Sequence, residues 1–126
     1  MQQAGPERRY HAFLEEGRFM IQRSRLTGRY IFYPRIAEPQ TGSIDLEWVE
    51  ASGRGTIHAV TVIQRRPPEP PYNVVLVDLA EGPRMMSRVE GTAPEAVYIG
   101  MAVQARIIRD EGQPVVVFVP ADGVAA

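Results

Sequence analysis

The chain has 126 residues, of which 44% are hydrophobic, and it contains no cysteine. This length suits one compact unit with its own core, and the absence of cysteine excludes disulfides and thiol catalysis. The net charge is −1 and all fourteen basic residues are arginine, so the charge argues against nonspecific binding to duplex nucleic acid.

Neither a membrane span nor an export signal is expected. The longest apolar runs are short and β-like, such as Val74 to Val77, whereas a membrane span needs about 20 apolar residues. The N-terminal residues carry no apolar stretch of the signal-peptide type. We therefore expect a cytoplasmic protein that does not bind a membrane.

The first predicted element is a short helix from Pro6 to Glu16. Proline at the first position and Gly17 just after the end are typical helix boundaries. Tyr10, Phe13 and Leu14 are spaced to form one apolar stripe. Because so short a helix is unstable alone in water, the stripe must dock. It docks either on the chain's own ribbon or barrel, or on a partner subunit.

Two matched turns follow, next to predicted strands at 18–23 and 29–34. The positions that a zinc ribbon uses for its ligands are filled here by Ser24, Thr27, Glu38 and Thr41. Hydroxyl groups do not ionise near neutral pH, and a single carboxylate is a poor site, so we predict no structural zinc. The alternative is that the two Thr-Gly pairs belong to ordinary turns.

The most aromatic stretch lies between Arg29 and Arg35. Rings flanked by arginine can stack on the bases of single-stranded nucleic acid, which makes candidates of Tyr30, Phe32 and Tyr33. A ribbon without metal, however, needs another way to offset the entropy lost on ordering. The simpler interpretation is therefore that these rings pack in a small core with Ile36, Leu46 and Trp48.

From residue 53 the pattern becomes all-β. Runs rich in β-branched residues predict five strands, at 56–63, 72–79, 84–89, 103–109 and 114–119. Short strands separated by Gly or Pro turns favour a small closed barrel over an open sheet. The predicted fold class is α+β, mainly β: a helix with its lead-in strand (1–22), a degenerate rubredoxin-like ribbon (23–50) and a five-stranded OB-fold barrel (51–122).

The candidate binding residues lie in two predicted hairpins of the barrel. The loop 65–71 has four prolines in seven residues and is expected to be extended and stiff, at the mouth of the barrel. Its two arginines can meet a phosphate or an acidic partner, or the loop is a plain connector. For Arg84 the alternative is an ion pair with Glu81 or Asp78. The residues predicted to bind a cofactor are Arg65, Arg66, Tyr72 and Arg84.

Catalytic chemistry is not expected from this inventory. His11 and His58 lie on different predicted elements, and no nucleophile motif surrounds a serine. The four aspartates and eleven glutamates are scattered among turns and strand ends, which is typical of a solvated surface. We therefore predict no catalytic residues and no metal ligands.

Several motifs in order give the chain a resemblance to a known family over residues 10 to 120. They include Gln22-Arg23-Ser24, Tyr33-Pro34-Arg35, Asp45-Leu46-Glu47-Trp48 and Val77-Asp78-Leu79-Ala80-Glu81-Gly82-Pro83-Arg84. The order and spacing resemble the zinc-ribbon plus OB-fold proteins of unknown function associated with thiolases and acyl-CoA metabolism. All four cysteines usual in that family's ribbon are replaced here.

The resemblance implies a non-catalytic accessory subunit of a thiolase- or aldolase-like acyl-CoA enzyme. Such a subunit supports assembly of the complex and helps to hold the CoA thioester, so acyl-CoA is its implied ligand. Self-association into a homodimer is left open. The alternative function is a module that binds single-stranded nucleic acid with the face from Arg29 to Arg35.

Overall fold

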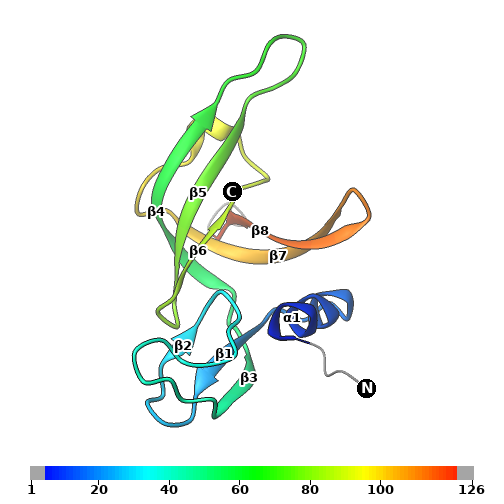
Figure 1. Cartoon of the computed structure of the whole chain (residues 1–126). Helices are drawn as coiled ribbons and strands as arrows, with labels where there is room; N and C mark the ends of the chain where they lie inside the picture. The colour runs from blue at the N-terminus through cyan, green and yellow to red at the C-terminus, as the bar shows by residue number, and fades with distance from the viewer. Residues whose placement is uncertain (1–4, 122–126) are drawn as a thin grey trace.

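A computed structural model describes residues 5–121, which form two antiparallel sheets and one α-helix (Figure 1). Within this part of the chain, no helix is long and apolar enough to cross a membrane. The elements in chain order are α1 (Pro6–Glu15), β1 (Met20–Ser24), β2 (Tyr30–Ile31), β3 (Leu46–Glu50), β4 (Arg54–Ile63), β5 (Tyr72–Leu79), β6 (Arg84–Ser87), the 3-10 helix η1 (Pro94–Ala96), β7 (Ala102–Asp110) and β8 (Gln113–Pro120).

The first sheet is the ribbon, in the order β2-β1-β3. Gln22 at its centre pairs with Ile31 on one side and with Trp48 on the other. Strand β2 ends at Ile31 and is therefore shorter than the predicted run at 29–34. Pro34, at the end of that run, has no amide proton to donate to a neighbouring strand. The second sheet lies above the ribbon in Figure 1.

The second sheet is a barrel with the strand order β6-β5-β4-β7-β8. It closes where the segment after β6 meets β8. The Phe118 amide donates to the Arg88 carbonyl at 3.0 Å, and the Glu90 amide donates to the Phe118 carbonyl at 2.8 Å. A parallel bridge joins Val89 to Phe118 between these two bonds. The predicted mainly β fold with a five-stranded OB-fold barrel is confirmed, and the observed strands lie within two residues of the predicted ones.

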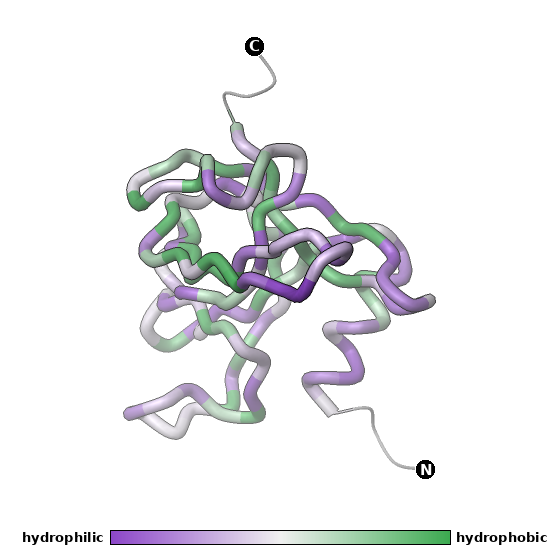
Figure 2. The backbone as a smooth tube through the Cα atoms, turned by 90° about the horizontal axis from the view of Figure 1, so that it is seen from above, coloured by the Kyte–Doolittle hydropathy of each residue, from purple (hydrophilic) through white to green (hydrophobic). Residues whose placement is uncertain are grey.

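The apolar stripe of α1 docks on the chain itself. Tyr10 and Leu14 are buried in the main core, and the ring of Tyr10 lies 5.4 Å from that of Phe32 in the ribbon. The ring of Phe13 lies 5.3 Å from that of Trp48. Figure 2 shows the helical turns that follow the N-terminus as mainly hydrophilic. The stripe is therefore used for internal packing of helix, ribbon and barrel.

The predicted small core of the ribbon is partly right. Phe32, Tyr30 and Trp48 pack against the main core. Ile36, however, is 74% exposed and Tyr33 is 53% exposed, so their prediction as core residues was wrong. The reason is geometric: the chain leaves the sheet after Ile31, and the strand alternation that would turn these side chains inward no longer applies.

Candidate functional site

The four residues at the ligand positions of the ribbon meet at the end of β1. The hydroxyls of Ser24 and Thr41 donate to Oε1 of Glu38 at 2.7 and 2.8 Å. The hydroxyl of Thr27 donates to Oε2 of the same carboxylate at 2.5 Å. Glu38 is only 3% exposed and Ser24 is fully buried. The spacing in the sequence thus corresponds to a real convergence of side chains in space.

The two turns that hold these side chains are built alike. The amides of Gly28 and Gly42 donate to the carbonyl of the first residue of their own turn, at 2.8 and 2.9 Å. Both glycines have positive φ, near +79° and +73°, a conformation that glycine adopts without steric cost. In each turn the threonine hydroxyl accepts an amide proton from two residues further on, at 3.2 Å. These are matched knuckles as well as Thr-Gly turns.

The residues in the knuckles do not fit a zinc ion. Structural zinc takes thiolate or imidazole ligands, and the side chains here are three hydroxyls and one carboxylate. All three hydroxyl protons are directed at the carboxylate, so its oxygens are already used. Among residues 5–121 no group of three or more His, Asp or Glu side chains is placed to hold a metal ion.

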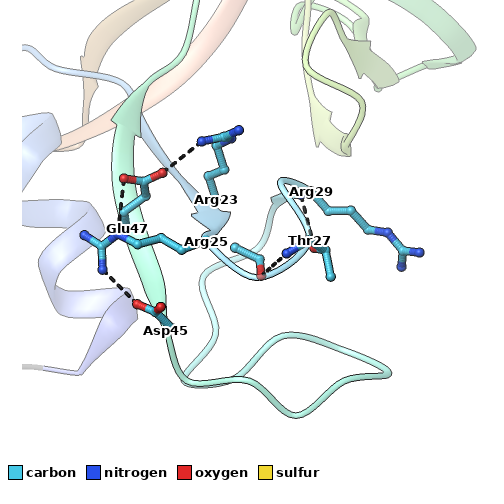
Figure 3. Close-up of polar contacts among 7 residues, drawn as sticks. Arg23, Arg25, Thr27, Arg29, Asp45 and Glu47 are labelled. Carbon is cyan, nitrogen blue, oxygen red and sulfur yellow. Dashed lines mark hydrogen bonds and ion pairs between the residues drawn. The ribbon is translucent and has the colours of Figure 1, made fainter.

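Ion pairs tie the first knuckle to β3, as Figure 3 shows. Arg23 lies 3.1 Å from Glu47, and Arg25 lies 2.8 Å from Asp45 and 3.5 Å from Glu47. These side chains are between a quarter and 60% exposed, so solvent screening leaves each pair worth little. They fix the geometry of the knuckle more than they stabilise the fold.

The pKa of Glu38 makes the ribbon sensitive to acid. Hydrogen bonds from Thr27, and then from Ser24, hold the pKa of this carboxyl below its ordinary value of 4.5, although burial opposes the shift. Thr41 and the positive charge of Arg29 act in the same direction, and the same hollow is lined by Arg35. Because the folded pKa is the lower one, Glu38 stabilises the fold above pH 4.5, and this contribution is lost as pH falls towards the folded pKa.

We therefore expect the stability of the wild-type chain to fall below pH 4.5 more steeply than that of Glu38→Gln, which cannot ionise. Denaturant unfolding followed by Trp48 fluorescence between pH 3 and pH 7 measures this, since Trp48 is the only tryptophan and lies in β3. Equal pH dependence in the two proteins would contradict the assignment.

A groove of about 420 Å³ lies between α1, the ribbon and the barrel. Its walls are mainly apolar and include Tyr10, Phe32 and Met85, while Glu7 and His11 of the helix add polar groups. The hydroxyl of Tyr33 accepts the amide proton of Met86 in the barrel's strand β6, at 3.1 Å. This groove was not predicted, because its walls come from segments far apart in the sequence.

The predicted binding residues lie at two ends of the barrel. The guanidinium of Arg65 stacks on the ring of Tyr72 at 4.3 Å and pairs with Glu69 at 3.0 Å. Arg84 instead pairs with Asp78 at 2.7 Å. The pairs are separated by most of the length of β5, roughly 20 Å at about 3.4 Å per residue. Figure 1 shows the β4-β5 loop pointing away from the ribbon and the β5-β6 turn pointing towards it.

The loop with four prolines is not extended along its whole length. The amide of Glu69 donates to the carbonyl of Arg66 at 3.0 Å, so the chain turns at these residues. The turn is required because β4 and β5 are antiparallel and paired up to Ile63 and Tyr72. Arg65 and Arg66 nevertheless lie together at the tip of the hairpin, as the sequence indicated, and both are exposed.

The two histidines lie in different surroundings. His11 lines the groove, whereas Nδ1 of His58 on β4 lies 3.3 Å from Asp78. Asp78 is shared between His58 and Arg84, and the hydrogen bond from Arg84 is the main cause that lowers its pKa. This arrangement is a surface ion-pair cluster. It offers no nucleophile next to a base.

Fold and knuckles together define the class of protein: an OB-fold barrel that carries a zinc-ribbon-like sheet with hydroxyl and carboxyl side chains in its knuckles. Residues 48–107 match the family described as the C-terminal OB-fold domain of ChsH2. A "DUF35 domain-containing scaffold protein" of Methanothermobacter thermautotrophicus is 34% identical over 110 residues, which cover 76% of this chain and 83% of the relative. The chain belongs to the DUF35 family.

Other relatives are longer proteins or parts of complexes. A "probable enoyl-CoA hydratase alpha subunit" of Thermomonospora curvata is 36% identical over 93 residues, which are 71% of this chain but 29% of that protein. This chain thus spans less than a third of that relative. A solved structure described as "Ltp2-ChsH2(DUF35) aldolase" superposes with a TM-score of 0.82 and 31% identity, covering 96% of this chain and 98% of the other. The family resemblance found in the motifs is confirmed.

Proposed function

We propose that this protein is a non-catalytic scaffold subunit of an enzyme that processes acyl-CoA thioesters. The observation that carries the proposal is the match along nearly the whole length of a chain in a solved aldolase complex. Relatives named as hydratase alpha subunits and as scaffold proteins support the same role. In this proposal the partner is a thiolase-, aldolase- or hydratase-like enzyme, and it carries out the reaction.

The side chains described above support a role without catalysis. The carboxylates that lie near cations are bound in surface ion pairs, and the buried one accepts three hydroxyl protons. Each of these groups is engaged by other side chains of the chain, which supports a structural role for them. The nucleic-acid alternative gains no such support, because the ring of Phe32 packs against the rings of Tyr10 and Phe19 within the chain.

The first test is purification of the tagged chain from its native host under gentle conditions, followed by mass spectrometry of what comes with it. We expect an acyl-CoA enzyme in near-stoichiometric amount, and we expect thioester turnover only when that enzyme is present. Turnover of an acyl-CoA by the purified chain alone would contradict the proposal. So would recovery of RNA or single-stranded DNA in place of an enzyme.

Within this proposal, the exposed tip of the β4-β5 hairpin contacts the phosphates of CoA. The guanidinium of Arg65 stacks on Tyr72, and Arg66 is the next residue of the same exposed turn. A guanidinium that pairs with a phosphate makes strong, charge-assisted hydrogen bonds. Arg65 and Arg84 are both in surface ion pairs, with Glu69 and Asp78. Arg84 lies alone at the other end of β5, away from the adjacent arginines of the hairpin tip, so we assign it a smaller part.

The double variant Arg65→Ala/Arg66→Ala is therefore expected to raise the Kd of the assembled complex for an acyl-CoA by about tenfold or more. Arg84→Ala serves as a control, since it removes one guanidinium at the opposite end of β5, and it should change the Kd much less than the double variant does. Titration calorimetry with the purified complex measures both. An unchanged Kd in the double variant would rule out the hairpin tip as the phosphate contact.

A further inference from the structure

We propose that Glu38 and the three hydroxyls around it form a structural centre that takes the place of a metal ion in this ribbon. Two of the hydrogen bonds join the two knuckles across the chain, from Ser24 and from Thr27 to Glu38. The third, from Thr41, closes the second knuckle on itself. A metal in a ribbon does the same work, because it links two turns that are distant in sequence.

The donors and acceptors of this centre balance. Each hydroxyl has one proton, which it directs at the carboxylate, and each hydroxyl oxygen accepts one backbone amide, at 3.2 Å in all three cases. An ionised carboxylate only accepts, so it suits three donors. If residue 38 carried an amide or a protonated carboxyl, its own N–H or O–H group would face at least one hydroxyl that now donates to it. With Ser24 and Glu38 buried, water cannot easily repair that mismatch.

The centre also fixes the chain between the knuckles, which forms one wall of the groove. Beyond β2 this segment is clamped to β1 by Gln22, whose side chain donates to the Arg35 carbonyl at 2.7 Å and accepts its amide proton at 2.6 Å. Phe32 and Tyr33 lie between the end of β2 at Ile31 and the Gln22 contact at Arg35, and both line the groove. Loosening the knuckles is therefore expected to loosen this wall while leaving the barrel intact.

The test compares Glu38→Gln with Glu50→Gln in the full chain, since Glu50 is an exposed residue of the same sheet. Thermal unfolding is followed by Trp48 fluorescence for the ribbon and by far-UV circular dichroism for the barrel. We expect Glu38→Gln to lower the Trp48 midpoint by roughly 5 °C or more, and Glu50→Gln to change it by about 1 °C at most. Chelator should leave the wild-type midpoint unchanged.

A second pair of variants keeps the test informative if Glu38→Gln fails to fold. Thr41 is exposed, so Thr41→Val removes the hydroxyl with little effect on packing, whereas Thr41→Ser retains it. Thr41→Val should lower the Trp48 midpoint and Thr41→Ser should restore most of it. Equal midpoints for Val and Ser would overturn the proposal. A wild-type protein that contains one zinc per chain and melts earlier in chelator would also overturn it.

Discussion

Replacing Phe118 with alanine is expected to destabilise the chain by about 3–5 kcal/mol, the usual cost of removing a buried aromatic ring. Phe118 is fully buried on β8, and its backbone makes the bonds that close the barrel. The cavity left by the ring would lie in the hydrophobic core, to which Phe118 belongs. Urea denaturation at neutral pH measures the loss, with the slope of the transition checked for constancy.

The matched control for this change is Val119→Ala. Val119 is the next residue of the same strand, points to the other face and is only half-buried. Its truncation should cost about 1 kcal/mol or less. If both variants lost the same amount of stability, the two side chains would not differ in burial as described.

Placing cysteine at all four knuckle positions is expected to create a zinc site. The variant Ser24→Cys/Thr27→Cys/Glu38→Cys/Thr41→Cys supplies the four thiolates that a structural zinc ribbon uses, on turns that already converge. Structural sites of this kind bind zinc with an apparent free energy of about 10 kcal/mol or more near pH 7. The reduced variant should bind one zinc per chain and become sensitive to chelator.

Cobalt substitution gives the readout, since tetrahedral thiolate coordination of cobalt produces a strong visible absorption. A control with only Ser24→Cys and Thr27→Cys has half of the ligands and should bind far more weakly. If the four-cysteine variant bound no better than this control, the two knuckles would not be placed as matched halves of one site.

The knuckles of this chain hold one carboxylate and three hydroxyls at the positions where a zinc ribbon carries its ligands. Retention of both knuckle glycines and of the amide bonds to the hydroxyls keeps the turns in shape. In this chain the shape of the two turns is thus held by backbone conformation and by hydrogen bonds to the hydroxyls.

Local order was largely determined by the sequence. Proline and glycine set the ends of α1, β-branched runs set the five barrel strands, and the two Thr-Gly turns set the knuckles. These features depend on a residue and its near neighbours in the chain, so periodicity and turn chemistry suffice to predict them. The spacing of Ser24, Thr27, Glu38 and Thr41 belongs to the same group.

Only the tertiary structure decided which distant groups meet. Arg84 pairs with Asp78 and Arg65 stacks on Tyr72, at opposite ends of β5. The residues predicted to bind a cofactor therefore lie in two separate places. The tertiary structure also turned Ile36 to solvent and joined Tyr33 to Met86, 53 residues further along the chain. Such contacts depend on how the strands curve and on which edges meet. A pattern of near neighbours predicts that a barrel closes, but it does not tell which distant side chains the closure brings together.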